Sequence, residues 1–142
     1  MAEFYEVELR VRYQETDQMA IVYHANYLNW FEVGRTEWLR EYGLSYRSME
    51  EQGWLLPVTE VWCKYHASAK YDDLVRIKIW IDTLSKLRMT FGYEVTRATD
   101  GEKLVSGKTE HVFINREGQV QRINRILPDL YELMQQKAVS SR

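Results

Sequence analysis

Apolar and polar residues alternate along several stretches of the chain, and one long stretch between them has a different repeat. In residues 5–13, Tyr5, Val7 and Leu9 fall on one face, and the charged residues between them fall on the other. A period of two is typical of a strand with one buried and one solvated face. Four further strand-like stretches follow, at residues 55–70, 74–83, 89–98 and 103–115.

Residues 27–42 carry apolar side chains at every third or fourth position, which predicts an amphipathic helix of ~24 Å. Asn26 is expected to cap its N-terminus, with a start already at His24 as the alternative, and Gly43 is expected to end it. Gly34 falls on the apolar face of this helix. A residue without a side chain at that position indicates that another backbone comes close.

Short turns join the later strands, and Asp100-Gly101 is a typical hairpin sequence. Strands joined by short turns are antiparallel neighbours. The predicted fold class is therefore α+β, with a five-stranded antiparallel sheet wrapped around one long central helix. Residues 44–53 are expected to form a loop, and Pro128 is expected to start a short C-terminal helix that ends at Gln136.

No repeat, low-complexity tract or linker divides the chain, so residues 1–142 are expected to form a single domain. A sheet that is covered by one helix is incompletely closed. We therefore expect copies of the chain to assemble through the edges or faces of their sheets.

Composition and charge exclude several functions. The formal net charge is -2, so the chain lacks the basic field that a nucleic-acid partner would require. Cys63 is the single cysteine, which excludes an internal disulfide, and we expect it to be buried as a small hydrophobe. No spacing of His, Cys and Asp indicates a metal site. A signal peptide and a membrane-spanning apolar run are both missing, so the cytoplasm is the expected location.

Asp17 lies seven residues before His24, where the predicted helix begins. A carboxylate there could attack a carbonyl group or activate water, and the free amides of a helix N-terminus could stabilise the developing negative charge. From the residue types alone, the commoner interpretations are a turn aspartate and a surface or capping histidine. Glu15, two residues before Asp17, is interpreted as solvated.

Residues 17–28, D-Q-M-A-I-V-Y-H-A-N-Y-L, resemble the signature of the hot dog-fold acyl-CoA thioesterases of the 4-hydroxybenzoyl-CoA thioesterase and YbgC-like group. Two less specific matches, at residues 65–73 and 111–115, follow in the order of that family. The resemblance implies the hot dog fold and the hydrolysis of an acyl-CoA to a free acid and CoA. The family often has glycine where this chain has Ala20, so Ala20 is strained if that position needs a positive φ.

The resemblance also implies roles for individual residues. Asp17 would be the nucleophile or general base, and the backbone amide of His24 would polarise the thioester carbonyl. The His24 side chain would orient the water or the substrate, and Tyr23 would line the site. The apolar pocket for the acyl group is expected to be lined by Tyr27, Phe31, Trp54 and Leu56.

Other acids compete with Asp17 for the catalytic role. Another branch of hot dog thioesterases takes its acid from the long helix, where this chain has Glu32 and Glu37. The favoured interpretation is a solvated helix face on which these acids pair with Arg35 or Arg40.

Coenzyme A carries phosphates, so cations are expected along its groove. In the family, the nucleotide end is bound where this chain has Lys86 and Arg88, and Arg122 and Arg125 form a second cationic pair. Because coenzyme A is part of the substrate, no separate cofactor is expected. The family forms homodimers through a continuous sheet, often paired into homotetramers, with the CoA groove between subunits.

Two other functions stay open. One is a thioesterase that acts on acyl carrier protein, which is acidic, so a broad basic rim around the groove would favour it. The other is a hot dog protein that binds an acyl thioester without turnover, because fold alone does not determine function.

Overall fold

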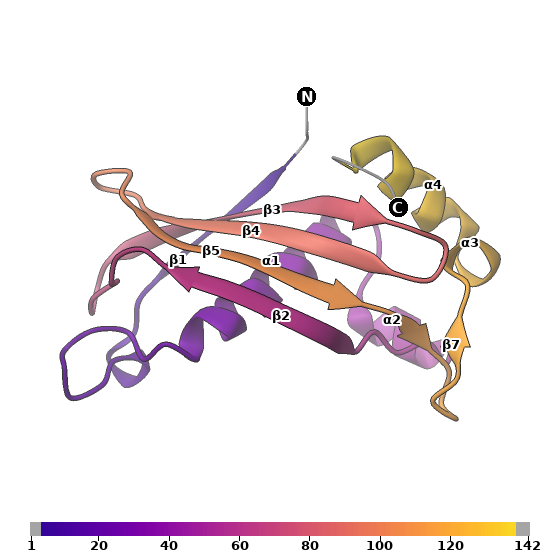
Figure 1. The fold of residues 1–142 in the computed structure, drawn as a ribbon, viewed down its shortest axis with the longest axis horizontal. Helices are drawn as coiled ribbons and strands as arrows, with labels where there is room; N and C mark the ends of the chain where they lie inside the picture. Colours follow the sequence, from indigo (N-terminus) through magenta and orange to yellow (C-terminus); the bar gives the residue numbers. More distant parts are fainter. Residues whose placement is uncertain (1–3, 139–142) are drawn as a thin grey trace.

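The computed structural model describes residues 4–138, so residues 1–3 and 139–142 of the predicted single domain lie outside the described part (Figure 1). Its strands are β1 (Tyr5–Arg10), β2 (Val58–Tyr65), β3 (Leu74–Leu84), β4 (Met89–Arg97), β5 (Lys103–His111), β6 (Phe113–Ile114) and β7 (Val120–Gln121). Its helices are the 3-10 turn η1 (Tyr13–Glu15) and the α-helices α1 (Asn26–Glu41), α2 (Tyr46–Glu51), α3 (Ile123–Ile126) and α4 (Pro128–Lys137).

Strands β1 to β5 form one antiparallel sheet in the order β1-β3-β4-β5-β2, which confirms the predicted five-stranded sheet. The alternation in β1 is also confirmed, because every second residue is half-buried and the residues between are exposed. The strand ends at Arg10, three residues earlier than predicted. After it, the Val11 amide donates to the Asp73 carbonyl at 2.9 Å, and the chain turns into η1.

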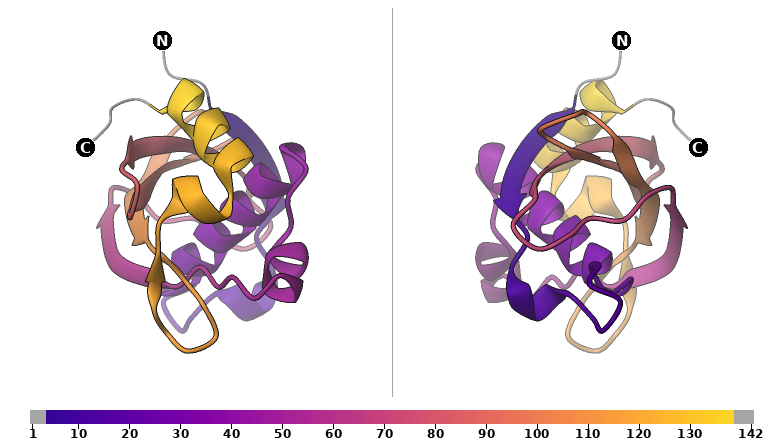
Figure 2. Two further views of the ribbon diagram at one scale, coloured as in Figure 1. Left: turned by 90° about the vertical axis from the view of Figure 1, so that its right-hand side faces the viewer. Right: turned by 90° about the vertical axis from the view of Figure 1, so that its left-hand side faces the viewer.

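The sheet curls around α1, as the two end-on views of Figure 2 show. Trp30, Phe31 and Trp38 on the inner face of α1 are almost completely buried. A Cβ atom at Gly34 would lie 3.3 Å from Cγ2 of Ile77 in β3. Strand β3 is the element that comes close at Gly34, and the side chains of Ile77 and Ile79 are its nearest atoms. Gly43 has a φ of 84° directly after the helix, which confirms it as the residue that ends α1.

Three segments differ from the expected elements. The expected loop contains α2, whose N-cap Ser45 accepts a hydrogen bond from the Ser48 amide at 3.0 Å. The last long strand is interrupted at Val112, and its second part, β6, pairs with β7 in a separate two-stranded sheet. Pro128 starts α4 as predicted, and the shorter α3 precedes it.

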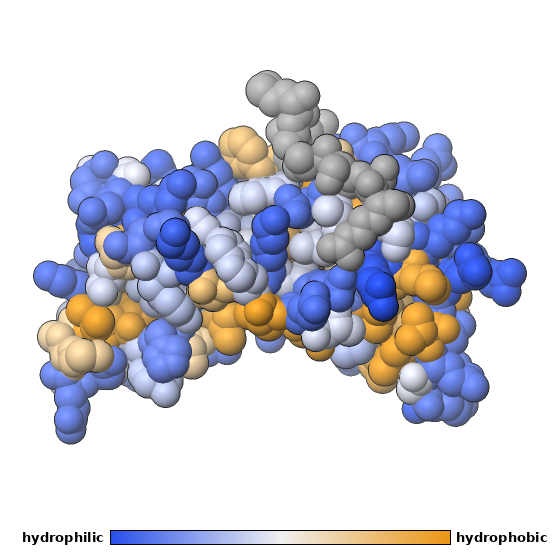
Figure 3. All heavy atoms as spheres, viewed as in Figure 1, coloured by the Kyte–Doolittle hydropathy of each residue, from blue (hydrophilic) through white to orange (hydrophobic). Residues whose placement is uncertain are grey.

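The convex face of the sheet, which points toward the viewer in Figure 3, is mainly hydrophilic. Arg76 on β3 and Lys108 on β5 are exposed there. The opposite face packs on α1 and is apolar, so Ile77 and Ile79 in β3 and Val95 in β4 are fully buried. One wet and one buried face is the arrangement that antiparallel sheets allow.

Strand β2 forms one edge of the sheet and is poorly covered. Val61 and Tyr65 pair with Thr109 and Val105, whose side chains are buried on the helix side, so both residues face inward. They are nevertheless 49% and 46% exposed. Cys63 between them is half-buried rather than fully buried, and this burial raises the pKa of its thiol.

Candidate functional site

Asp17 lies in a tight hairpin closed by a bridge between Thr16 and Val22. The Asp17 amide donates to the Ile21 carbonyl, and the Ala20 amide donates to the Asp17 carbonyl, both at 2.9 Å. One carboxylate oxygen of Asp17 accepts a hydrogen bond from the Met19 amide at 2.8 Å. The hairpin therefore fixes the side chain as well as the backbone of this half-buried residue.

Ala20 has a φ of 64°, so the hairpin does require a left-handed residue at this position. An L-residue with a Cβ atom is disfavoured in that conformation by roughly 1–2 kcal/mol. The four-residue turn from Asp17 to Ala20 nevertheless closes with a hydrogen bond. The backbone strain expected at Ala20 is therefore present, three residues after the candidate catalytic acid.

Glu15 is buried, and the expectation that it is solvated was wrong. Its carboxylate accepts hydrogen bonds from the Arg12 amide at 2.8 Å and from Nε1 of Trp30 at 2.9 Å. Its carbonyl accepts from the Tyr23 amide at 2.9 Å and from the Asn26 side chain at 2.8 Å. Glu15 therefore joins η1 to the start of α1 on both sides of the Asp17 hairpin.

The start of α1 lacks the expected cap. Ala25 occupies the N-cap position without a side-chain hydrogen bond, and Asn26 is the first helical residue, so the predicted Asn26 cap was wrong. Within residues 4–138, no hydrogen bond joins the His24 amide to another group. Amides at a helix N-terminus carry the positive end of the helix dipole. The backbone at His24 can therefore offer a donor to a ligand.

A cavity of ≈ 260 Å³ lies between the Asp17 hairpin, the start of α1 and the end of β2. It brings together Asp17, His24 and Tyr27 of the predicted site. Its walls are formed by Asp17, Met19, Ile21, Val22, His24, Tyr27, Tyr65, His66, Ala67 and Ser68.

Tyr23 is not among these lining residues and is largely exposed. Its ring centroid lies 4.6 Å from that of His24, whose side chain is also exposed. The structure thus places Tyr23 beside the site, in contact with a residue that borders the cavity.

Two tyrosine hydroxyls fix the cavity walls. The Tyr65 hydroxyl donates to the His24 carbonyl at 3.1 Å, and the Tyr27 hydroxyl accepts from the Ala69 amide at 3.0 Å. Burial raises the pKa of both phenols, that of Tyr65 to about 12, so both stay protonated near neutral pH. The sequence did not predict that Tyr65 and His66 line this cavity. Both are the first residues of the second matched motif, at residues 65–73, which was the available signal.

The remaining predicted acyl-pocket residues lie elsewhere. Phe31 is fully buried and stacks on Tyr93, with ring centroids 4.2 Å apart. Trp54 and Leu56 are partly buried and pack against the core. None of these three side chains lines the cavity beside Asp17, so their proposed contact with the acyl group stays a prediction.

The competing acids on α1 do not line this cavity. Glu32 is exposed, and Glu37 forms an ion pair with Arg40. Arg35 is buried instead, and its guanidinium donates to the hydroxyls of Tyr46 and Tyr93. Across the described part of the chain, no group of three or more His, Cys, Asp or Glu side chains is placed to hold a metal ion.

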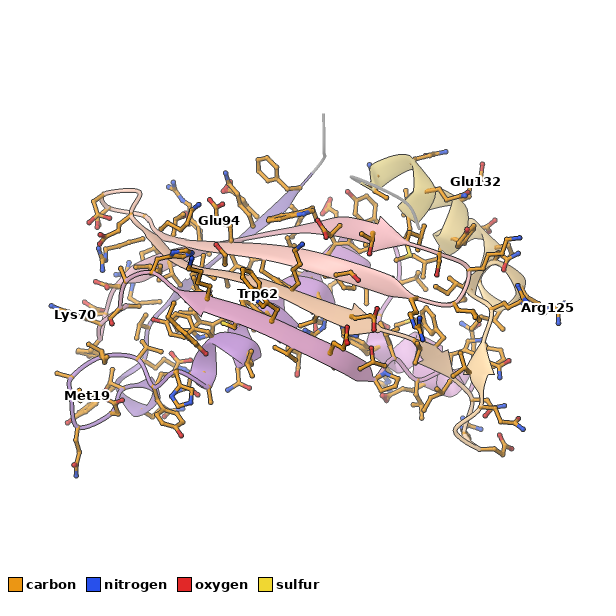
Figure 4. All side chains as sticks on the ribbon, in the orientation of Figure 1. Met19, Trp62, Lys70, Glu94, Arg125 and Glu132 are labelled. Carbon is orange, nitrogen blue, oxygen red and sulfur yellow. The ribbon has the colours of Figure 1, made fainter. Side chains whose placement is uncertain are left out.

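The four predicted phosphate-binding cations gather at the other end of the molecule. Lys86 and Arg88 lie in the β3–β4 turn, which contacts α3 through a 2.7 Å hydrogen bond from the Ile123 amide to the Lys86 carbonyl. Figure 4 shows Arg125 at this end and Met19 of the Asp17 hairpin at the opposite end. The cations are exposed, and none forms an ion pair with a described acid: Lys86, Arg88, Arg122 and Arg125. Within one chain, they are therefore not brought together with Asp17.

No helix within residues 4–138 combines the length and apolar composition needed to cross a membrane.

The family model described as the thioesterase-like superfamily matches residues 11–134. A Bacillus subtilis protein, provisionally named acyl-CoA thioesterase YneP, is 37% identical over 110 residues, which are 78% of this chain and 79% of YneP. A chloroplastic acyl-acyl carrier protein thioesterase of Arabidopsis thaliana is 29% identical over 123 residues, which are 87% of this chain and 65% of that protein.

Among solved structures, the DHNA-CoA thioesterase of Staphylococcus aureus superposes with a TM-score of 0.90 at 36% identity, covering 94% of this chain and 89% of the other. The likeness confirms the predicted hot dog fold. The superfamily match covers most of the chain, from before the Asp17 hairpin to the C-terminal helix. The chain therefore belongs to the thioesterase-like superfamily, the thioester hydrolases that share this fold.

Proposed function

We propose that this protein is an acyl-CoA thioesterase, which hydrolyses an acyl-CoA to a free acid and CoA with Asp17 as its nucleophile or general base. The observation that carries the proposal is the cavity of ≈ 260 Å³ bordered by both Asp17 and His24. The YneP relative, 37% identical, supports the same substrate class by its name. Water is the second substrate, and no cofactor beyond the CoA of the substrate enters the proposed reaction.

The two residues would divide the chemistry between them. The thioester carbonyl oxygen would accept a hydrogen bond from the His24 amide, which stabilises the negative charge of the tetrahedral intermediate. Asp17 would either attack the carbonyl carbon, giving a mixed anhydride that water then cleaves, or remove a proton from the attacking water. In both routes, the CoA thiolate leaves and takes up a proton. The His24 imidazole would orient the water or the substrate at the mouth of the cavity, and Tyr23 would border the site through its contact with the His24 ring.

CoA binding in this proposal requires a second copy of the chain. Met19 of the Asp17 hairpin and Arg125 of the cationic group lie at opposite ends of the molecule (Figure 4). Two copies that pair antiparallel through β2, eight residues and ~27 Å long, would place the Asp17 end of one against the cationic end of the other. The inward-facing but exposed Val61 and Tyr65 support this pairing, because a second copy would cover them. We therefore propose a homodimer with shared sites, which can pair further into a homotetramer.

An acyl carrier protein substrate is the second candidate. The 29% identical plant relative acts on such a carrier according to its name, and the cluster of four exposed cations suits an acidic partner. The ratio of kcat/KM for one acyl group on CoA and on the carrier protein would decide between the two. A carrier preference that survives removal of Arg122 and Arg125 would exclude these two arginines as the carrier contact.

The test of the catalytic proposal is a thiol-release assay with short, long and aromatic acyl-CoAs. Asp17→Asn keeps the size of the side chain and removes the carboxylate, so kcat should fall by about 100-fold or more. Glu32→Gln is the matched control, because it removes an exposed helix carboxylate outside the cavity, and its turnover should equal that of the unmodified chain.

Two results would contradict this proposal. Turnover in Asp17→Asn equal to that of the unmodified chain would exclude the carboxylate as base or nucleophile. Tight binding of acyl-CoA by the unmodified chain without thiol release across the panel would support a binding protein instead of an enzyme.

A further inference from the structure

Tyr65, the last residue of β2, connects the edge of the sheet to the start of α1. Its hydroxyl donates to the carbonyl of His24 at 3.1 Å, across 41 positions of sequence. Its ring meets the Tyr27 ring edge-on at a centroid distance of 5.6 Å and the His24 imidazole at 6.2 Å. The phenol therefore approaches the cavity from β2 and ends on the backbone of the residue proposed to polarise the thioester.

Other hydrogen bonds hold the residues around His24. The Asn26 amide donates to the Tyr23 carbonyl at 2.9 Å, and the Glu15 carbonyl accepts from the Tyr23 amide and from the Asn26 side chain. The N-cap residue Ala25 contributes no side-chain hydrogen bond. The Tyr65 hydroxyl is consequently the side-chain group that fixes the peptide following His24, between the two points held by Glu15.

We propose that Tyr65 is a positioning residue, whose hydroxyl holds the His24 backbone so that its amide points at the thioester carbonyl. This inference rests on the proposed function. The phenol acts as a hydrogen-bond donor throughout the neutral range, since burial raises the pKa of Tyr65 to about 12. In this role the hydroxyl acts through the backbone of His24 and not by exchanging a proton with the substrate.

The carbonyl oxygen gains its negative charge only as the reaction proceeds. A misaligned hydrogen-bond donor therefore reduces the stabilisation of the transition state more than it reduces the binding of the substrate. Tyr65→Phe removes the hydroxyl and retains the ring. Loss of one neutral hydrogen bond should lower kcat by roughly fivefold to tenfold. KM should change by less than about twofold, because the hydroxyl is engaged by the His24 carbonyl and the ring that lines the cavity is retained.

Tyr5→Phe is the matched control. Tyr5 is the first residue of the other edge strand, is half-buried, and its hydroxyl bonds to no described residue. Its kcat, KM and Tm should match those of the unmodified chain. The assembly state of Tyr65→Phe should be unchanged, and its Tm should fall by no more than the few degrees that the loss of one hydrogen bond costs. A fall in kcat that accompanies a larger loss of Tm or a changed assembly state would overturn the positioning role.

The pH profile separates positioning from acid-base catalysis. The ratio of kcat between the unmodified chain and Tyr65→Phe should be constant from pH 6 to pH 9, because the phenol stays protonated. A ratio that varies with pH in this range would show that Tyr65 exchanges protons, and the proposal would fail.

A measurement without substrate distinguishes this inference from the function on which it rests. The backbone amide resonances of His24 and Ala25 should shift in Tyr65→Phe and stay in place in Tyr5→Phe, since the lost bond belongs to their shared backbone. Unshifted resonances would overturn the role of Tyr65 even if the protein is a thioesterase. If the resonances shift but the unmodified chain releases no thiol from any acyl-CoA, the proposed function would be wrong and the contact of Tyr65 with the His24 backbone would stand.

Discussion

At the scale of single residues, the Asp17 hairpin contains a conformation that its own sequence disfavours. Ala20 has a φ of 64°, which costs an L-residue roughly 1–2 kcal/mol. Ala20→Gly removes that cost and adds about 0.4–1 kcal/mol of chain entropy to the unfolded state. The net expectation is a stabilisation of up to about 1 kcal/mol, measured by urea unfolding. Ala25→Gly is the control and should lower the free energy of unfolding, because Ala25 has a helical φ of -68°. An equal decrease in the free energy of unfolding of both variants would contradict the strain at Ala20.

A buried histidine makes stability depend on pH. A chain of hydrogen bonds runs from Arg35 through Tyr93 and Thr109 to His111, which is fully buried. Burial, and then the positive charge of Arg35, lower the pKa of His111 to about 3. The folded protein therefore keeps His111 neutral, whereas the unfolded chain protonates it below about pH 6.5.

The sign of the pH effect follows from this difference. Between about pH 6.5 and pH 3 the unfolded chain binds more protons, so the free energy of unfolding should decrease as pH falls, by up to about 1.4 kcal/mol per pH unit. Urea unfolding at a series of pH values measures this slope. It should be shallower in His111→Gln and unchanged in His66→Gln, because His66 is exposed. Equal slopes in all three proteins would exclude His111 as the source.

The residues of the site were predictable only where they are contiguous in sequence. Asp17 and His24 fall within one short motif at a helix start, so both residues and their proposed roles could be predicted from that motif. Glu15 and its partner Trp30 are fifteen positions apart, and Tyr65 and His24 are 41 apart. No spacing rule connects such pairs, because the fold alone brings them into contact.

At the scale of elements, two glycines make room for aromatic rings on opposite faces of the sheet. A Cβ atom at Gly107 would lie 2.3 Å from Cζ of Phe31, which is fully buried between α1 and the sheet. A Cβ atom at Gly92 would lie 2.4 Å from Cε2 of Trp80, which is half-buried on the convex face. The two positions therefore have similar clashes and different freedom to relieve them.

Gly107→Ala should lower the free energy of unfolding by about 2–3 kcal/mol, because Phe31 has no space into which it can move. Gly92→Ala should cost about 1 kcal/mol or less, because the Trp80 ring can rotate toward solvent. Urea unfolding of both variants measures the difference. A larger loss in Gly92→Ala than in Gly107→Ala would show that the inner face repacks more easily than its burial indicates.

Long periodic elements were predictable, and short or interrupted ones were not. The repeat of α1 and the alternation of β1 and β3 extend over enough residues to identify both types. Helix α2 has six residues, too few to display a helical repeat, although Ser45 was a usable capping signal. The break at Val112 lies inside an apolar run, so nothing in the pattern separates β5 from β6.

At the scale of the whole molecule, the proposed sharing of sites can be tested with a heterodimer. One chain carries Asp17→Asn, and the other carries Arg122→Ala and Arg125→Ala, with different affinity tags for purification. If each site combines Asp17 of one chain with the cations of its partner, one of the two sites is intact. Such a heterodimer should show about half the kcat/KM of the unmodified dimer.

The parent homodimers are the controls, because each lacks one component at both sites. Activity of the heterodimer no higher than the mean of its parents would mean that Asp17 depends on the cations of its own chain. That outcome would contradict the antiparallel pairing through β2 and leave the catalytic role of Asp17 untouched.

In the proposed dimer, strand β1 would determine where growth of the joined sheet stops. A symmetric contact through β2 uses that edge in both copies, so β1 of each copy forms the outer margin of the joined sheet. This margin is six residues long and carries Glu6, Glu8 and Arg10 at alternate positions. Short, charged edge strands resist the addition of further strands. In the proposed dimer, the two unequal edges would therefore allow one strand-to-strand contact and oppose the addition of further copies.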